Sequence, residues 1–275
     1  MHCYVINLPM ARRRLERTTR ELATYCPGVA WSVPPMFVAT DMTDAQFAKL
    51  YDSRRAWRLH NRDLSRGEIA CALSHQSALT EFLKSDAACC LIVEDDVMFS
   101  PAVGGFLKGL EAWLVDWKEV PVGVVLSEAV AVRYWCARRW ISAIRRTRPL
   151  EVYGALAYVV NRQGAEHILR VNAVPIYTMS DHWSYYRAKG LRLFGTDKVL
   201  AGSYDYHRGD SSLSAGRAEI YRKSLSKRRH RPLFLRIAFS LKNRTASAWR
   251  RMTGVKGGER SNSRLFQLAE RKDGV

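Results

Sequence analysis

The sequence lacks the features that mark several large classes of protein. No CxxC pair occurs among its six cysteines, which argues against a zinc ribbon or a disulfide framework and favours buried, reduced thiols. No apolar run approaches the ~20 residues that are needed to span a bilayer. The apolar run 3–8 is too short for a signal peptide, and arginines follow it rather than precede it. We therefore expect a cytoplasmic protein.

Signatures of nucleotide-binding and nucleic-acid-binding proteins are also missing. The chain has no P-loop and no recognised RNA- or DNA-binding motif, and residues 1–216 contain no internal repeat. Its apolar fraction is 47% over 275 residues, which is ordinary for a globular protein. This length allows one large α/β domain, or one domain with an appendage.

Positive charge is concentrated toward the C-terminal end. The chain has 44 Lys and Arg against 26 Asp and Glu, a net charge of +18, and 17 basic but only 4 acidic residues lie from Arg217 onward. We therefore predict a mildly basic globular domain over residues 1–216 and a basic C-terminal helical extension over residues 217–275. A basic extension favours anionic surfaces.

The extension also carries an amphipathic pattern. Apolar residues between Leu233 and Met252 fall on one broad helical face, and Lys227-Arg228-Arg229 precede them. This pattern indicates an interfacial helix, whose apolar side chains enter the headgroup boundary while its cations meet anionic lipid. Docking of the same helix on the globular domain is the alternative. The first interpretation predicts a peripheral protein on the inner face of the cytoplasmic membrane.

Strands and helices alternate along the first 216 residues, which predicts an α/β layered domain. Two capping boxes, Thr43-x-x-Gln46 and Ser65-x-x-Glu68, mark helix starts. The predicted strands cover residues 2–8, 36–39, 87–93, 122–127, 152–160, 191–194 and 199–201. The predicted helices cover residues 11–25, 43–51, 65–83, 105–117 and 163–171, and a further helix starts near residue 180.

Three carboxylates, Glu94-Asp95-Asp96, follow the continuous apolar run 87–93, which is typical of a central strand covered on both faces. Ligands of open α/β sheets bind outside the carboxyl ends of strands. Adjacent like charges repel, and a hard cation such as Mg²⁺ or Mn²⁺ neutralises them. Alternation places Glu94 and Asp96 on one side of the chain. We predict that Asp96 binds the metal directly, that Glu94 binds it directly or through water, and that Asp95 binds a ribose or sugar hydroxyl; a solvated turn is the alternative.

Four motifs occur in a fixed order: YVINL at 4–8 with arginines at 12–14, GEIACALSH at 67–75, LIVEDDV at 91–97, and YGALAYVVNRQGA at 153–165. Over residues 2–215 the chain thereby resembles glycosyltransferase family 25. That family includes lipooligosaccharide galactosyltransferases of Gram-negative bacteria and collagen galactosyltransferase domains. The resemblance implies a GT-A-like nucleotide-sugar-binding domain with a mixed, mainly parallel sheet flanked by helices. It also implies an inverting mechanism, usually with UDP-galactose as donor.

The resemblance gives roles to residues outside the carboxylate cluster. Arg12 and Arg13 would meet the diphosphate or uridine of the donor; their alternative is the solvated face of a helix. Ser74 and His75 would hydrogen-bond hydroxyl groups of the donor or the acceptor. For His75 the alternative is a buried histidine whose hydrogen bonds are satisfied within the protein.

An inverting transfer needs a carboxylate that takes the proton from the attacking hydroxyl. Asp181 matches a family aspartate and is the first candidate; its alternative is to cap the following helix. Glu128, after the predicted strand 122–127, is the second candidate. His207 matches a family histidine that would complete the metal site, and imidazole suits Mn²⁺ better than Mg²⁺. A loop histidine without that role is the alternative.

Taken together, these features predict a metal-dependent hexosyltransferase. It would move galactose from UDP-galactose onto a saccharide hydroxyl of a lipooligosaccharide, LPS or related glycan. Its partners would be a nucleotide-sugar donor, a glycan or glycolipid acceptor and an anionic membrane surface, with no nucleic acid. Two other classes stay open: a nucleic-acid-binding protein that uses the basic tail, and a metal-dependent phosphotransferase or nuclease.

Overall fold

The computed structural model describes residues 1–127, 134–138, 141–144, 154–196, 199–205 and 220, with only the backbone described for 134–138 and 141–144. The strands are β1 His2–Ile6, β2 Ala30–Ser32, β3 Cys89–Glu94, β4 Val97–Phe99, β5 Val122–Val125, β6 Tyr134–Arg138, β7 Ile141–Ile144, β8 Ala157–Asn161, β9 Arg192–Gly195 and β10 Ala201–Ser203. The helices are α1 Arg12–Tyr25, α2 Asp44–Leu50, α3 Ser53–His60, α4 Arg66–Lys84, α5 Val103–Leu114, the 3-10 turn η1 Val115–Trp117, α6 Arg162–Val171 and α7 Trp183–Ala188.

Within the described residues, an eight-stranded mixed sheet has the order β2-β1-β3-β8-β5-β9-β7-β6. β1 pairs in parallel with both β2 and β3, and β5 pairs in parallel with β9. β8 and β7 run against their neighbours, so the other strands of this sheet share one direction. β4 and β10 form a separate antiparallel pair. The predicted α/β fold with a mixed, mainly parallel sheet is confirmed.

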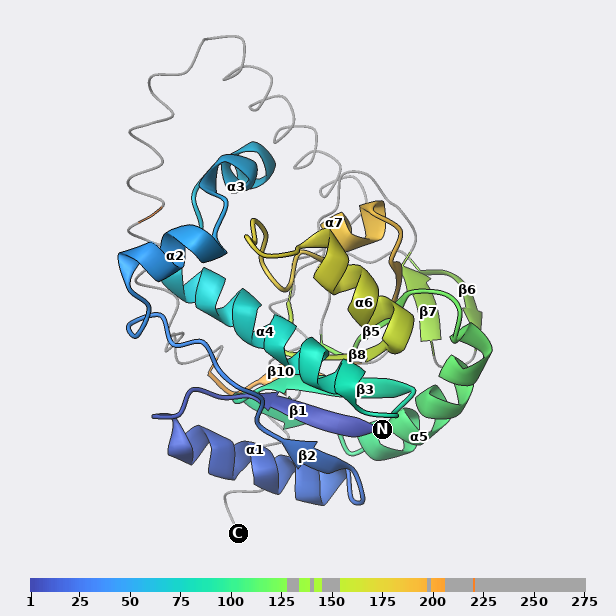
Figure 1. Cartoon of the computed structure of the whole chain (residues 1–275). Helices are drawn as coiled ribbons and strands as arrows, with labels where there is room; N and C mark the ends of the chain where they lie inside the picture. Colours follow the sequence, from blue (N-terminus) through green and yellow to red (C-terminus); the bar gives the residue numbers. More distant parts are fainter. Residues whose placement is uncertain (128–133, 139–140, 145–153, 197–198, 206–219, 221–275) are drawn as a thin grey trace, which may run out of the picture.

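Helices cover both faces of the sheet (Figure 1). On one face, α1 and α5 bury Leu22 and Leu107 against alternate strand residues. On the other face, α4, α6 and α7 bury Leu79, Ile168 and Trp183 against the intervening strand residues. Because each strand side chain points to one face or the other, the two apolar layers are separate cores on opposite sides of the sheet.

The predicted central strand is β3, and each of its residues before Glu94 is completely buried. Its side chains alternate between the two cores: Cys89, Leu91 and Val93 on one side, Cys90 and Ile92 on the other. A strand covered on both faces can carry only apolar residues at low cost. The change to carboxylates at Glu94 therefore marks the point where the chain leaves the covered part of the sheet.

Both capping boxes are present. Ser65 Oγ accepts from Glu68 N at 3.2 Å, and Glu68 Oε2 accepts from Ser65 N at 2.9 Å. The same reciprocal bonds join Thr43 and Gln46 at the start of α2. Each box satisfies two backbone N–H groups that have no partner inside the helix.

The five cysteines with described side chains are thiols, and Cys71 is the one that is not fully buried.

Residues 36–39, predicted as a strand, are irregular instead. Pro34 and Pro35 have no backbone N–H for a ladder, and Phe37 N donates to Ser74 Oγ of α4 at 3.0 Å. The strand that pairs with β1 on its outer side is β2, which precedes the two prolines.

Helix α3 was not predicted. The Asp52 side chain caps its first turn by accepting from Arg55 N at 2.9 Å, and Asn61 ends it in a left-handed conformation with φ 57°. Ala56 is its one buried residue, so a stripe of large apolar residues, the usual sign of a helix, is missing.

Among the described residues, no helix is both long enough and apolar enough to cross a membrane. Apart from Ile220, the predicted extension 217–275 lies outside the described residues. The division into a domain over 1–216 and an extension over 217–275 therefore stays a prediction.

Candidate active site

Polar side chains gather at one edge of the sheet, where β1, β3 and β5 end. β1 and β3 are parallel and in register, with Ile6 opposite Glu94, so Asn7 lies beside the carboxylates. β8 runs the other way and begins at this edge, where Leu156 O accepts from Glu94 N at 2.8 Å. Ser127 follows β5 at the same edge. This is the edge at which open α/β sheets bind ligands.

Asp95 is held by the first strand and the first helix. Asn7 Nδ2 donates to its Oδ2 at 2.8 Å, and Arg14 Nη1 donates to its Oδ1 at 3.2 Å. Thr18 Oγ1 donates to its backbone oxygen at 2.8 Å. Burial raises the pKa of Asp95, while the hydrogen bond from Asn7 and the charge of Arg14 act in the opposite direction. Both carboxylate oxygens of Asp95 are thus engaged within the protein.

Arg14 joins the cluster to the chain after β10. Its Nη2 forms an ion pair with Asp205 Oδ2 at 2.6 Å. Arg17, one turn along α1, lies 3.9 Å from Asp205 Oδ1, and its guanidinium stacks over the ring of Tyr204 at 3.9 Å. Helix α1 therefore connects two acidic segments that are far apart in the sequence.

Asp96 lies on the side of the cluster where negative charge exceeds positive charge. Ser203 Oγ donates to Asp96 Oδ2, and Tyr204 N donates to its backbone oxygen at 2.8 Å. Burial raises the pKa of Asp96 to about 6, and the negative charges of Glu94, Asp95 and Asp205 contribute to the same shift. Burial first, and the neighbouring carboxylates second, therefore make the ionised form of Asp96 less favourable.

The donor set fits a hard divalent cation. Arg14 balances Asp95, whereas the carboxylates of Glu94 and Asp96 offer oxygens to a cation that would relieve the charge at Asp96. Mg²⁺ and Mn²⁺ prefer such oxygen ligands. The third predicted ligand, His207, lies outside the described residues.

His75 is buried beneath the cluster, with 2% of its surface exposed. Its Nε2 lies 3.4 Å from Glu94 Oε1, and its Nδ1 is in hydrogen-bond contact with Tyr158 Oη at 3.0 Å. The neighbouring Ser74 is used by the protein itself, since its hydroxyl donates to Ala70 O at 2.9 Å and accepts from a backbone N–H. The structure thus brings His75, and not Ser74, to the carboxylates.

The predicted donor-binding arginines lie at the start of α1, directly before Arg14. Arg12 and Arg13 are exposed in the first turn of α1. Arg14, the next residue, is the arginine that contacts Asp95. An anionic donor at this edge would find Arg14 already paired with Asp95, whereas Arg12 and Arg13 are exposed to solvent.

Asp181 lies in the loop before α7 and contacts the segment that precedes β8. Its Oδ2 accepts from Gly154 N at 3.2 Å, and Gly154 O accepts from Trp183 Nε1 at 2.7 Å. Gly154 has φ 111°, which other residues rarely adopt. Because Gly154 is two residues from Leu156, Asp181 is at the same edge as Glu94. The N-cap of α7 is His182, so Asp181 is not the cap.

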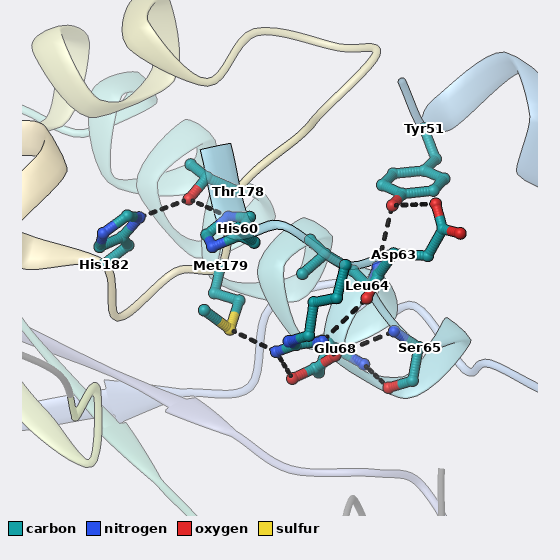
Figure 2. Close-up of polar contacts among 10 residues, drawn as sticks. Tyr51, His60, Asp63, Leu64, Ser65, Glu68, Thr178, Met179 and His182 are labelled. Atoms are coloured by element: carbon teal, nitrogen blue, oxygen red, sulfur yellow. Dashed lines mark hydrogen bonds and ion pairs between the residues drawn. The ribbon is translucent and has the colours of Figure 1, made fainter. Parts of the chain in front are cut away.

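The loop before α7 is joined by hydrogen bonds to α3 and to the chain between α3 and α4 (Figure 2). Thr178 Oγ1 lies between two histidines, 3.1 Å from His60 Nε2 and 3.0 Å from His182 Nδ1. Arg62 Nη2 donates to Met179 Sδ at 3.5 Å. Hydrogen bonds thus hold the loop that carries Asp181 at residues 178, 179 and 182.

Glu128, the second candidate base, lies outside the described residues. The preceding Ser127 is described, and a Cβ at Gly154 would be 3.7 Å from its hydroxyl. The end of β5 therefore faces the segment that binds Asp181. Several residues that the sequence did not single out contact the cluster: Asn7, Arg14, Thr18 and Ser203. Asp205 is joined to it through Arg14.

Comparison with known proteins supplies independent information. The model of glycosyltransferase family 25 (LPS biosynthesis protein) matches residues 1–183. The chain is 24% identical over 162 residues to procollagen galactosyltransferase 1 of Danio rerio, covering 51% of this chain and 26% of that protein. It is 22% identical over 159 residues to procollagen galactosyltransferase 2 of Homo sapiens, covering 51% and 25%. It is 24% identical over 213 residues to procollagen galactosyltransferase 1-B of Xenopus laevis, covering 69% and 33%.

The chain spans only about a quarter to a third of the length of these relatives. Among solved structures, A197 from STIV has a TM-score of 0.38 at 13% identity and covers 71% of this chain and 81% of its own. The CMP:2-keto-3-deoxy-manno-octonic acid synthetase complexed with CTP has a TM-score of 0.32 at 13% identity, with 80% and 81% covered. Neither score is high enough to establish a shared fold.

Proposed function

Because the chain belongs to glycosyltransferase family 25, we propose that it is a metal-dependent hexosyltransferase that moves galactose from UDP-galactose to a saccharide hydroxyl. The names of the relatives support galactose as the sugar. The family description, which refers to LPS biosynthesis, supports a lipooligosaccharide, LPS or related glycan as acceptor. The position of the carboxylate cluster carries this proposal, since it follows the buried strand β3 at the edge where open α/β sheets bind ligands.

In this proposal Glu94 and Asp96 hold Mn²⁺ or Mg²⁺, with His207 as a further ligand. The bound cation would neutralise charge on the diphosphate of the donor and of the leaving UDP. Asp95 would hold α1 against the cluster, since both of its oxygens already accept hydrogen bonds from Asn7 and Arg14. The predicted contact of Asp95 with a ribose or sugar hydroxyl remains part of the proposal, because each carboxylate oxygen can accept a further hydrogen bond.

The base in this proposal is Asp181. Inversion requires that the acceptor hydroxyl attack C1 from the face opposite the leaving UDP, and a carboxylate must take the hydroxyl proton as that bond forms. The hydrogen bond from Gly154 N fixes one oxygen of Asp181 at the edge where Glu94 lies. Glu128 is the second candidate for the same role.

The test is transfer by the Asp96→Asn variant, measured as UDP release from UDP-galactose with Mn²⁺ and a truncated lipooligosaccharide. We expect turnover to fall by about 10²-fold or more, because removal of one electrostatic stabiliser typically has that effect. Asp86→Asn is the matched control, since Asp86 is exposed and precedes β3 at the opposite edge of the sheet. Unchanged turnover in Asp96→Asn would contradict the proposed site.

The donor and the acceptor are tested separately with the unmodified chain. UDP-glucose and UDP-N-acetylglucosamine should give slower UDP release than UDP-galactose, and a procollagen-derived peptide should be a poorer acceptor than the truncated lipooligosaccharide. Faster transfer to the peptide would leave the enzyme class intact and replace the proposed acceptor.

A further inference from the structure

Beside the carboxylate cluster, three side chains of different chemistry converge on one point. Cys71 and His75 are four residues apart on α4, so their side chains lie on the same face of the helix. Glu94, at the end of β3, faces them. A sulfur, an imidazole nitrogen and a carboxylate oxygen from these residues all lie within 4.8 Å of one another. Neither Cys71 nor its contact with His75 has a part in the transfer reaction described above.

The imidazole of His75 supplies an independent sign of a missing ligand. Its Nε2 is buried and has no hydrogen-bond partner among the described residues, although Glu94 Oε1 is only 3.4 Å away. Buried polar nitrogens are normally hydrogen-bonded. The other ring nitrogen, Nδ1, contacts Tyr158 Oη at 3.0 Å. When Nδ1–H donates to that hydroxyl, Nε2 presents a lone pair to the space between Cys71 and Glu94.

This is the arrangement of a metal-binding histidine, in which a hydrogen bond at one ring nitrogen orients the other toward the metal. The donor set also indicates which metal. A thiolate and an imidazole with a single carboxylate suit a borderline cation such as Zn²⁺, whereas Mg²⁺ prefers oxygen ligands. Donor atoms around a tetrahedral zinc are about 3.5 Å apart, so small side-chain rotations would close the observed spacing.

We propose that Cys71, His75 and Glu94 form a second metal site, specific for zinc or a similar borderline divalent cation. Three protein ligands leave a fourth position for water. Cys71 is only partly buried, which gives the ion a route from solvent. Binding would release the thiol proton, because the thiolate is the ligand.

Glu94 belongs both to this site and to the carboxylate cluster, which has a consequence that rests on the proposed function. An ion bound to Cys71 and His75 takes the Glu94 carboxylate away from Asp96, and so weakens the binding of Mn²⁺ there. Zinc would therefore inhibit sugar transfer by competing for one shared ligand.

Cobalt provides the test, because Co²⁺ replaces Zn²⁺ and gives a near-ultraviolet charge-transfer band when a thiolate binds it. The full-length protein should show this band, and Zn²⁺ should abolish it. Cys71→Ser should lose the band and bind Zn²⁺ more than about tenfold more weakly. Cys26→Ala should keep the band, since Cys26 lies in the opposite core and burial raises the pKa of its thiol to about 11.

No band in the unmodified protein, or a band that persists in Cys71→Ser, overturns the proposal. Thermal unfolding checks that Cys71→Ser is folded; if it is not, Cys71→Ala decides by the same spectrum.

The consequence for catalysis has its own readout, the electron paramagnetic resonance of Mn²⁺. Zinc should release bound Mn²⁺ from the unmodified protein and fail to do so from Cys71→Ser. If the protein neither binds Mn²⁺ nor transfers galactose but still shows the cobalt band, the proposed function fails and the second metal site stands. If Zn²⁺ releases Mn²⁺ equally from both proteins, the competition through Glu94 is wrong.

Discussion

Burial and the neighbouring carboxylates both raise the pKa of Asp96. The pKa is raised to about 6 in the folded protein, whereas an unfolded aspartate has a pKa of about 3.9. Between these values the folded chain holds a proton that the unfolded chain has released. In the metal-free protein, the favourable contribution of Asp96 is therefore complete below pH about 4 and is lost as the pH rises through about 6.

Asp96→Asn removes this dependence, which gives a prediction with a definite sign. At pH 4 the variant and the unmodified protein should have similar free energies of unfolding, because both carry a neutral side chain. At pH 8 in the presence of a chelator the variant should be the more stable, by up to about 3 kcal/mol. Urea unfolding at the two pH values measures the difference. A variant that is less stable at pH 8 would show that Asp96 carries a balanced charge.

Arg14 supplies the charge that Asp95 and Asp205 need, and it is one-third exposed. Arg14→Ala should lower the free energy of unfolding by about 1–3 kcal/mol, because a buried carboxylate loses its charged partner. Arg13→Ala is the control in the same helical turn, and its exposed side chain should change stability by less than about 0.5 kcal/mol. Equal effects in urea unfolding would mean that the ion pairs of Arg14 contribute nothing.

The Asp181→Asn variant tests whether Asp181 acts as the catalytic base or binds the donor. The amide can still accept from Gly154 N, so the loop should keep its place and UDP-galactose should bind as before. Turnover should fall by about 10²–10⁴-fold, the usual contribution of a general base. Steady-state kinetics with a titration of donor binding measures both effects. A weaker affinity for the donor with unchanged turnover would assign Asp181 to donor binding.

Some contacts of the candidate site can be predicted from one sequence, and others cannot. The repulsion within Glu94-Asp95-Asp96 was sufficient to predict a charged site at the end of a buried strand. The helical spacing of Arg14 and Thr18 with the buried Leu22 places Arg14 on the inner face of α1, and this pattern is present in the sequence. Contacts from Ser203 and Asp205 depend on the position of β10 beside β4, which no local pattern encodes.

At the scale of elements, α4 connects fold and site. It begins at the capping box of Ser65 and Glu68, and it places Cys71 and His75 under the end of β3. Glu68 is buried, and both of its carboxylate oxygens accept hydrogen bonds from Arg62, at 2.7 and 2.8 Å. One carboxylate therefore fixes both the start of this helix and the chain that precedes it.

Ser65→Ala should destabilise the protein by about 1 kcal/mol, since it removes the side-chain acceptor of the cap. Thr43→Ala makes the same change in the other capping box, but α2 buries none of its residues and should lose less. Thermal unfolding of the two variants measures the difference. A larger loss in Thr43→Ala would show that α2 contributes more to the folded state than its burial indicates.

Elements with strong local signals were predicted best. The two capping boxes and the apolar run of β3 each fix one element by short-range physics, and all three are present. The prediction of a strand at residues 36–39 is wrong. Phe37 N donates a hydrogen bond to Ser74 Oγ of the distant helix α4 and not to a neighbouring strand. Helix α3 was not predicted, because its sequence has a capping residue, Asp52, but no stripe of large apolar residues.

For the whole molecule, the alternation of strands and helices predicted the class of fold but not the order of the strands. β8 lies between β3 and β5 and runs against both, although β5 precedes it in sequence. This insertion brings Gly154 to the edge where β3 ends. The meeting of Asp181 with the carboxylate edge follows from that topology, and a single sequence contains no local signal for it.

The excess of basic residues in 217–275 predicts that this extension binds an anionic surface. We propose that this extension binds anionic membranes, which would bring the enzyme to a lipid-linked acceptor. Replacement of Lys227, Arg228 and Arg229 by Glu should weaken binding to phosphatidylglycerol vesicles by more than about 100-fold at low salt, because each cation near the surface contributes about 1 kcal/mol. Vesicle sedimentation measures the change.

The matched control reverses three exposed charges in the described domain, Arg20→Glu, Lys49→Glu and Arg54→Glu. It has the same net charge as the tail variant and should bind vesicles nearly as well as the unmodified chain. Equal loss in both variants would mean that net charge, and not the extension, determines binding. Tighter binding of the unmodified chain to duplex DNA than to vesicles at ~150 mM salt would favour the nucleic-acid alternative.

The clamp formed by Arg14 with Asp95 and Asp205 has a consequence for the synthesis of the chain. Asp95 lies 81 residues after Arg14, and Asp205 is near the far end of the described domain. A ribosome-bound chain that has emerged only as far as β4 carries the acidic cluster without Ser203 or Asp205. Contacts between distant segments form slowly, so the cluster should acquire its final geometry only after almost the whole domain has been translated.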